Sequence, residues 1–306
     1  MSVRFDVACA ADCCVDLILQ GNVRPRFGQV EQLIERCTLE LGGSANIFAT
    51  QFVKLGGSAA VIGAVGADPF GDLVRERLST AGVDIRRVRR VPKLQTGVGF
   101  TLTEPRDRAI LTFLGSINAV RPADLTPALA QSCRHWHIAS FFLLTKLRRT
   151  WPAWLVRLRR QGVSTSLDTN WDPSEKWHGV NAMLPHVDVF LPNEAEACAI
   201  SGARDVAAAG RALAARGPLV VIKQGGAGAQ AFHRDGIWRV PVSRVLSKPP
   251  RVVDSIGAGD NFDAGFLRAW LLKKPIEECL TWGIRCGAAS LSAVGGIRGQ
   301  VVRRLT

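Results

Sequence analysis

Short apolar runs alternate with amphipathic stretches along most of the chain. The apolar runs have the length of buried strands and lie at 5–11, 60–65, 135–139, 164–168, 187–191 and 219–223. The amphipathic stretches have helical spacing of their apolar residues and lie at 44–55, 70–82, 149–161, 193–201, 206–216, 261–273 and 276–293. This alternation predicts an α/β fold in which helices cover a mostly parallel central sheet.

Two stretches break the alternation. Residues 17–39 and 92–117 contain strand-like runs separated by turn residues, with no convincing helix. Strands without intervening helices indicate a second, smaller sheet made by two excursions that pair in space. We expect this sheet to cover a cleft as a lid.

Length and composition fit an ordinary globular protein. The chain has 306 residues, of which 47% are hydrophobic and 21% charged, enough for one large domain. No apolar run approaches the roughly 18 residues that span a bilayer, and aspartates interrupt the N-terminal stretch, so we expect a cytoplasmic protein without a membrane partner. The eight cysteines form no Cys-x-x-Cys pair, which favours reduced thiols over disulfides or a zinc site.

The formal net charge of +13 raises the question of a nucleic-acid partner. The excess comes from short arginine clusters at 86–90, 148–149, 157–160 and 303–304. None of these clusters is interleaved with aromatic residues as in a stacking platform for bases. We therefore interpret them as solvated faces and expect no nucleic-acid partner.

The stretch DSIGAGDNFDAGF, residues 254–266, places small residues directly before a carboxylate and a helix. Free N–H groups and the positive end of the helix dipole both favour an anion at such a turn. Asp260 would then stand where it could take a proton from an alcohol aligned on a phosphate. The alternative is that Asp260 only caps the helix.

Two further groups of polar residues suit a hydroxyl-rich ligand. Gly42, Gly43 and Asn46 begin a helix after a tight turn, where an amide side chain can both donate and accept. Asp12 and Asp16 lie near the end of the first predicted strand, and Asn170 follows the strand at 164–168. The carboxyl ends of parallel strands are where ligands bind in such sheets. A tight turn with a helix cap, and exposed strand-end acids without function, are the structural alternatives.

Two stretches are compatible with a nucleotide. Asn193 and Glu196 have the spacing of a capping box, although Glu196 could also orient water on magnesium. Residues 221–232, VIKQGGAGAQAF, run from a strand through a glycine-rich turn into another strand, and they lack the Walker pattern. The backbone at this turn could pass close to a nucleotide or form a plain hairpin.

Together and in this order, these stretches resemble the ribokinase-type (PfkB) family of carbohydrate and nucleoside kinases over nearly the whole chain. DSIGAGDNF is similar to the family's C-terminal signature, with Ser255 in place of the usual threonine. Residues 41–57 and 62–84 resemble its N-terminal signature region. LPNEAEA and SLDTN resemble its N-x-x-E and D-x-N elements.

The resemblance implies a single domain over residues 1–306: a three-layer α/β/α sandwich with a mostly parallel central sheet and a β-sheet lid that often also supports a homodimer. It implies Asp260 as the catalytic base and an anion hole made by the amides of Gly257, Ala258 and Gly259. The implied substrate residues are Asp12, Asp16, Gly42, Gly43, Asn46 and Asn170. The implied nucleotide residues are Asn193, Lys223, Gly225, Gly228 and Gly287. Glu196 would bind Mg²⁺ through water, and Asp254 matches a ligand of a monovalent cation such as K⁺.

The implied function is ATP-dependent phosphorylation of a primary hydroxyl of a ribose- or fructose-type sugar. One alternative is a nucleoside kinase for adenosine, inosine or cytidine, with Phe100, Phe113 and Trp171 as candidate stacking surfaces. Another is a non-catalytic sugar- or nucleotide-binding protein that touches nucleic acid. Trp171 and Asp172 stand where sugar-acid kinases of the family often have an arginine, which argues against a carboxylated substrate.

Overall fold

The computed structural model describes residues 4–104, 107–248 and 250–305, and its centre is a nine-stranded sheet. Residues 105–106, within the predicted stretch 92–117, lie outside the described residues. The strand order is β13-β12-β11-β10-β9-β8-β1-β4-β5. All neighbours pair in parallel except β12 and β13, which add antiparallel strands at one edge. The strands are β1 (Phe5–Ala10), β4 (Ala59–Gly66), β5 (Asp84–Val91), β8 (Cys133–Ile138), β9 (Ser164–Leu167), β10 (Val189–Phe190), β11 (Leu219–Lys223), β12 (Ala229–His233) and β13 (Gly236–Val240).

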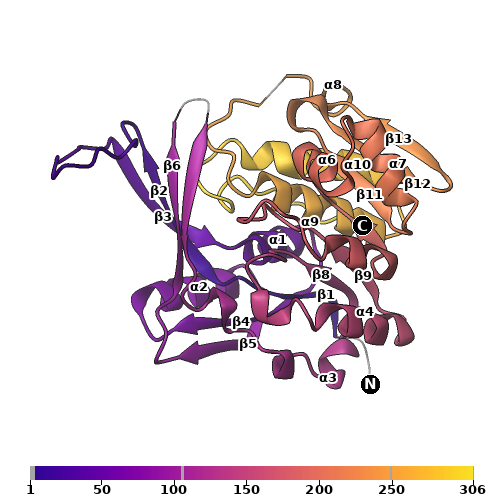
Figure 1. Ribbon diagram of the computed structural model, residues 1–306, viewed down its shortest axis with the longest axis horizontal. Helices are drawn as coiled ribbons and strands as arrows, with labels where there is room; N and C mark the ends of the chain where they lie inside the picture. The colour runs from indigo at the N-terminus through magenta and orange to yellow at the C-terminus, as the bar shows by residue number, and fades with distance from the viewer. Residues whose placement is uncertain (1–3, 105–106, 249, 306) are drawn as a thin grey trace.

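Helices cover both faces of this sheet, so the three-layer α/β/α architecture is confirmed (Figure 1). One face carries α1 (Ser44–Lys54), α2 (Pro69–Thr80), α8 (Val242–Val245), α9 (Ala258–Leu271) and α10 (Ile276–Ser290). The other face carries α3 (Pro127–Ala130), α4 (Trp151–Arg160), α5 (Val180–Met183), α6 (Glu194–Ser201) and α7 (Val206–Ala214). Among the described residues, no helix is long and apolar enough to cross a membrane.

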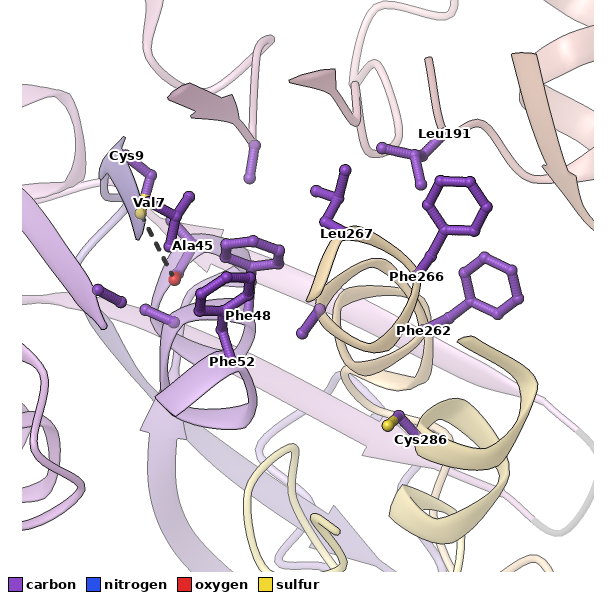
Figure 2. Packing of buried hydrophobic residues seen from close by; sticks show 14 of the residues in the cluster. Val7, Cys9, Ala45, Phe48, Phe52, Leu191, Phe262, Phe266, Leu267 and Cys286 are labelled. Carbon is purple, nitrogen blue, oxygen red and sulfur yellow. Dashed lines mark hydrogen bonds between the residues drawn. The ribbon is translucent and has the colours of Figure 1, made fainter. Parts of the chain in front are cut away.

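Alternate residues of each central strand point to opposite faces of the sheet, and each face has its own hydrophobic core. In β1, Val7 and Cys9 face α1 and α9, whereas Ala8 and Ala10 face α4 and its neighbours. Side chains in a strand point to opposite faces, so a strand buried on both sides is apolar throughout. Figure 2 shows the first core, where Phe48 of α1 and Leu267 of α9 lie over the sheet. This packing holds α1 and α9 side by side, and their N-termini frame the candidate site.

A second sheet stands apart from the first. It has four strands in the order β3-β2-β6-β7, with β2 and β6 parallel and the outer pairs antiparallel. The two excursions therefore pair in space, and Figure 1 shows them extending away from the main sheet. The pairing reaches Cys14 and Gly42, beyond the predicted stretch 17–39. The strands are β2 (Cys14–Gln20), β3 (Arg36–Gly42), β6 (Gly97–Thr103) and β7 (Arg108–Phe113).

Besides short elements that were not predicted, such as α3, α5, α8 and β13, two differences from the sequence prediction concern β5 and α9. The arginine-rich segment 84–91 is not only a solvated face: it is β5, an edge strand in which Val88 is buried and the arginines mostly point outward. Edge strands tolerate charge because one side of the strand faces water. Helix α9 begins at Ala258 rather than at residue 261, because Gly257 adopts a left-handed conformation with φ +69° and starts the helix there.

Candidate active site

Among the described residues, the N-terminus of α9 has no side-chain cap on its backbone amides. Gly257 precedes the first turn, and a Cβ at this position would lie 2.9 Å from the Ile47 side chain and 3.0 Å from Gly296 Cα. Uncapped N–H groups at a helix N-terminus, with the positive end of the dipole, make a site for an anion. The Ala258 N–H makes one long bond, 3.4 Å to the Ser255 carbonyl, and the anion hole at Gly257, Ala258 and Gly259 stays a prediction.

Asp260 follows these amides in the first turn of α9, and its residue is 7% exposed. Burial raises the pKa of Asp260 to about 7, and the nearby charge of Asp168 adds to the rise, while Lys223 opposes it. A carboxyl group with a pKa close to neutral can exchange a proton under physiological conditions, as a general base must. The side chain is buried among other acids rather than used as a plain helix cap.

Asp12 follows β1 and binds the start of α1. Its two carboxylate oxygens accept the Ser44 N–H at 2.9 Å and the Ala45 N–H at 3.1 Å. The Ser140 hydroxyl donates a third bond at 2.6 Å. Asp12 is therefore buried and caps α1. A substrate hydroxyl bound by Asp12 would form a fourth hydrogen bond to this carboxylate.

Asp16 lies in β2 of the second sheet, so its expected place at the end of the first strand is wrong. The chain turns at residues 11–13, without glycine or proline, from one sheet into the other. The Asp16 carboxylate fills the space beside two glycines: a Cβ on Gly99 would lie 2.6 Å from its Oδ1, and one on Gly42 would collide with it. Burial raises the pKa of Asp16 to about 7, with further contributions from Asp12 and Asp260, so Asp16 and Asp260 face one region.

The two predicted asparagines tie the turns of this region together. Asn46 is fully buried and donates to the Gly42 carbonyl at 2.8 Å. Asn170 accepts the Ser140 N–H at 2.7 Å and donates to the Ser44 hydroxyl at 2.9 Å. Gly43, with φ +88°, leaves no room for a Cβ beside the Asp12 carbonyl. The predicted substrate residues thus gather where β1, β2, β9 and α1 meet.

Asn193 and Glu196 form the capping box that their spacing predicts. The Asn193 side chain accepts the Glu196 N–H at 2.9 Å, and Glu196 Oε2 accepts the Asn193 N–H at 2.9 Å. Glu196 is nevertheless buried, and burial raises its pKa to about 7, followed by the charge of Asp168. Its other carboxylate oxygen makes no bond in the described structure, so the residue fits a water molecule on a metal ion as well as a cap.

The predicted nucleotide residues have different surroundings: one glycine is exposed, two glycines are closely packed, and the lysine is mostly buried. Gly225 has φ +52° in the exposed turn after β11, with open space around it. Gly228 and Gly287 allow close packing: a Cβ on Gly228 would collide with the Val240 carbonyl, and one on Gly287 would lie 3.0 Å from the Ala258 carbonyl. Lys223 points inward and donates to Asp168 at 2.7 Å and to Asp263 at 3.2 Å.

Asp254 bridges the segment before α9 and the turn after α10. Its carboxylate accepts the Ile256 N–H at 3.0 Å and the Gly295 N–H at 2.8 Å, and the residue is buried. The described residues include no group of three or more His, Cys, Asp and Glu side chains arranged to bind a metal ion directly. Any metal here would need water or phosphate oxygens as further ligands.

Sequence reasoning left out Asp263, Arg108 and Ser44. Asp263 lies one turn after Asp260 on α9, so helical spacing could have indicated it. Arg108 of β7 donates to the Ser255 hydroxyl at 3.0 Å, which joins the second sheet to the turn before α9. Nothing local in the sequence indicates this contact, because it joins positions 147 residues apart.

A model of the pfkB family of carbohydrate kinases matches residues 4–301. The chain belongs to this family. Its sequence is 32% identical to a fructokinase of Klebsiella pneumoniae over 306 residues, covering 94% of this chain and 93% of the relative. It is 31% identical to an ATP-dependent ribose-1-phosphate kinase of Halopiger xanaduensis over 256 residues, covering 83% of this chain and 81% of the relative.

Solved kinase structures have the same fold as this chain. A structure from E. coli described as a Ribokinase II, in complex with ATP and Mg²⁺, superposes with a TM-score of 0.85 at 22% identity. The superposition covers 97% of this kinase and 96% of the other chain. The ribokinase-like fold expected from the sequence is confirmed. This protein is therefore a sugar or nucleoside kinase, and its acceptor is a small molecule.

We expect Asp260→Asn to stabilise this kinase in a pH-dependent way. The folded pKa of Asp260 is above its ordinary value, so the folded state binds a proton more tightly and loses stability as pH rises from about 4 to 7. The asparagine variant escapes this loss. Its free energy of unfolding should exceed that of the wild type by about 1 to 3 kcal/mol at pH 8, with little gain at pH 4.

Urea denaturation at both pH values measures the difference. Asp235→Asn is the matched control, because the Asp235 side chain is 67% exposed. An equal effect of Asp260→Asn at pH 4 and pH 8 would contradict the raised pKa.

Proposed function

We propose that this kinase transfers the terminal phosphoryl group of ATP to a primary hydroxyl of a ribose- or fructose-type sugar, with Asp260 as the general base. One observation carries the proposal: a buried carboxyl with a pKa of about 7 directly follows uncapped amides at the start of α9. A phosphate bound at these amides would lie beside an acid that can take up a proton.

The residues would divide the work of an in-line transfer. The amides of Gly257, Ala258 and Gly259 would bind the terminal phosphate and stabilise the charge that develops on it. Asp260 would accept the proton of the attacking hydroxyl. The remaining sugar hydroxyls would bind at the junction of the two sheets, through Asp12, Asp16, Gly42, Gly43, Asn46 and Asn170. Holding both reactants in line supplies most of the rate.

The donor would lie along the carboxyl ends of β10 and β11. Asn193 and Glu196 would hold a water molecule of Mg²⁺, which when bound neutralises phosphate charge. The exposed turn at Gly225 would contact the nucleotide, with Gly228 and Gly287 shaping the backbone near it. Lys223, predicted to lie along the nucleotide, would act on the phosphates through its charge and not by contact, since its amine is bound to Asp168 and Asp263. Asp254, with lone pairs still available on both oxygens, would be a ligand of K⁺ beside the anion hole.

The second sheet, from the stretches 17–39 and 92–117, would act as a lid of a single domain spanning residues 1–306. Its strand β7 already contacts the turn before α9 through Arg108 and Ser255. A closed lid would keep water away from the phosphate and so limit hydrolysis of ATP.

A nucleoside is the second candidate acceptor. Trp171 is 51% exposed and directly follows Asn170, and its ring packs edge-on against Trp177 at 5.1 Å. A half-exposed indole beside a predicted substrate residue suits stacking on a base. Phe113 is exposed and Phe100 is half-buried, and both lie on the neighbouring strands of the second sheet.

Asp260→Asn should lower kcat by roughly 10² to 10⁴ with little change in the KM for ATP, because a positioned base acts on the acceptor proton. The wild-type rate should fall below about pH 7, as Asp260 takes up its proton. Steady-state kinetics with an ADP-coupled assay measure both effects. Near-normal turnover of the variant would remove Asp260 from this role.

The acceptor is identified by ADP release across one panel: ribose, fructose, ribose 1-phosphate, 2-keto-3-deoxygluconate, adenosine, inosine and cytidine. We expect the highest kcat/KM with a ribose- or fructose-type sugar, and low turnover of the carboxylated 2-keto-3-deoxygluconate. Replacing K⁺ by tetramethylammonium should lower the rate if Asp254 holds K⁺. Preference for a nucleoside would favour the second candidate, and silence across the panel would contradict the proposal.

We also infer a homodimer formed through the lid. Ile110, Leu111 and Phe113 of the edge strand β7 are exposed, and another copy would cover them. Light scattering after size exclusion should give a dimer mass, and Ile110→Glu with Leu111→Glu should give a monomer. Ile237→Glu on the other exposed edge strand, β13, is the matched control. A monomeric wild type would overturn the inference.

A further inference from the structure

Four buried acids surround one lysine beneath the start of α9. Lys223 Nζ lies 2.7 Å from Asp168 Oδ2 and 3.2 Å from Asp263 Oδ1. Glu196 and Asp260 are also near enough to be affected by its charge. Buried charges require partners. In the described structure, the Lys223 ammonium group is the partner of these carboxylates, in a place where a cluster of acids without it would attract a metal ion.

The topology explains why these groups meet. Asp168 directly follows β9, and Lys223 ends β11 two strands away in the same parallel sheet. The carboxyl ends of parallel strands lie at one edge, and α9 begins over this edge with Asp263 one turn after Asp260. Side chains from distant parts of the sequence are thus brought together under one helix N-terminus.

The ammonium group also lies against the backbone of the predicted anion hole. A Cβ built on Gly259 would lie 3.4 Å from Lys223 Nζ, and no other side chain would be closer. The Lys223 side chain is only 12% exposed, so its charge acts through a poorly screening interior. A positive charge next to Gly259 adds to the positive end of the helix dipole at this turn.

The charges around Asp260 are otherwise acidic. The titratable groups that face it are Asp12 after β1, Asp16 in β2, Asp168 after β9, Glu196 in α6, Lys223 in β11 and Asp263 in α9. Lys223 holds the pKa of Asp168 below its usual value despite burial, whereas burial raises the pKa of Asp263 well above it. The ammonium therefore favours the ionised form of Asp168, whereas burial disfavours the ionised form of Asp263.

We propose that Lys223 is a positioning residue for phosphoryl transfer: its buried ammonium, held beside Gly259 under the start of α9, favours the ionised form of Asp260 and adds to the positive end of the helix. Asp168 and Asp263 hold the ammonium in place. This rests on the proposed function, because it assigns Asp260 the role of base. Lys223 acts through Asp260 and the helix backbone, and touches neither substrate.

Lys223→Met tests the proposal, because methionine keeps the apolar stem and removes the charge. We expect kcat to fall about 10- to 100-fold while the KM values for ATP and acceptor change less than about threefold. The acid limb of the kcat profile should move up by about one pH unit, since a nearby opposite charge lowers a carboxyl pKa by about 1 to 3 units.

Two further variants separate charge from structure. Lys223→Met with Asp168→Asn removes both members of the ion pair, so the acid limb should return toward that of the wild type while kcat stays low. Lys54→Met is the matched control: Lys54 is half-buried and donates to the Ile297 carbonyl, away from these acids. Its profile should not move. Thermal unfolding checks that each variant folds. If Lys223→Met alone does not fold, the double variant still allows kcat to be measured without the Lys223 charge.

A direct titration separates this inference from the proposed function. Carboxyl ¹³C resonances of aspartate, assigned with Asp260→Asn, report the pKa of Asp260 without turnover, and it should rise in Lys223→Met. An unshifted titration, or wild-type kcat in the folded double variant, would overturn the role of Lys223 and leave the kinase function standing. A wild type that phosphorylates no acceptor would instead overturn the proposed function, while the titration would still report on the charge.

Discussion

The start of α9 depends on one backbone constraint: Gly257 must adopt a left-handed conformation in a space that admits no side chain. This turn starts the helix early and leaves its first amides without a cap. Because uncapped amides favour negative charge, a group of acids can gather nearby and still face a positive helix end. The close packing of α9 on α1, visible in Figure 2, fixes where that end points.

The acids differ in their state because their partners differ. Asp12 has three hydrogen bonds and serves the start of α1, whereas Asp168 has an ammonium partner. Asp16 and Asp260 lack comparable partners and have pKa values near 7. Burial also raises the pKa of Asp12 despite its three bonds, so these acids share the effect of burial and differ in the partners that oppose it.

Much of this arrangement follows from the sequence. Hydrophobic periodicity predicts an α/β fold, the family resemblance implies its three layers, and the absence of helical spacing predicts the second sheet. Asp16 was misplaced because small residues at 11–13 carry the chain between sheets without a glycine or proline to mark the turn. The partners of Lys223 lie 55 and 40 residues away, so no local pattern could reveal them. Strand β5 was missed because its arginines hide the alternation of an edge strand.

Asp16 belongs to the second sheet, whereas Asp260 belongs to the helical layer. Under the proposed mechanism, an acceptor molecule would have to be long enough to contact Asp16 while its hydroxyl lies at Asp260. A water molecule is too small to make that bridge, so it would gain no help from Asp16 in aligning with Asp260. The kinase would then favour the acceptor over water because only the acceptor is long enough to contact both Asp16 and Asp260.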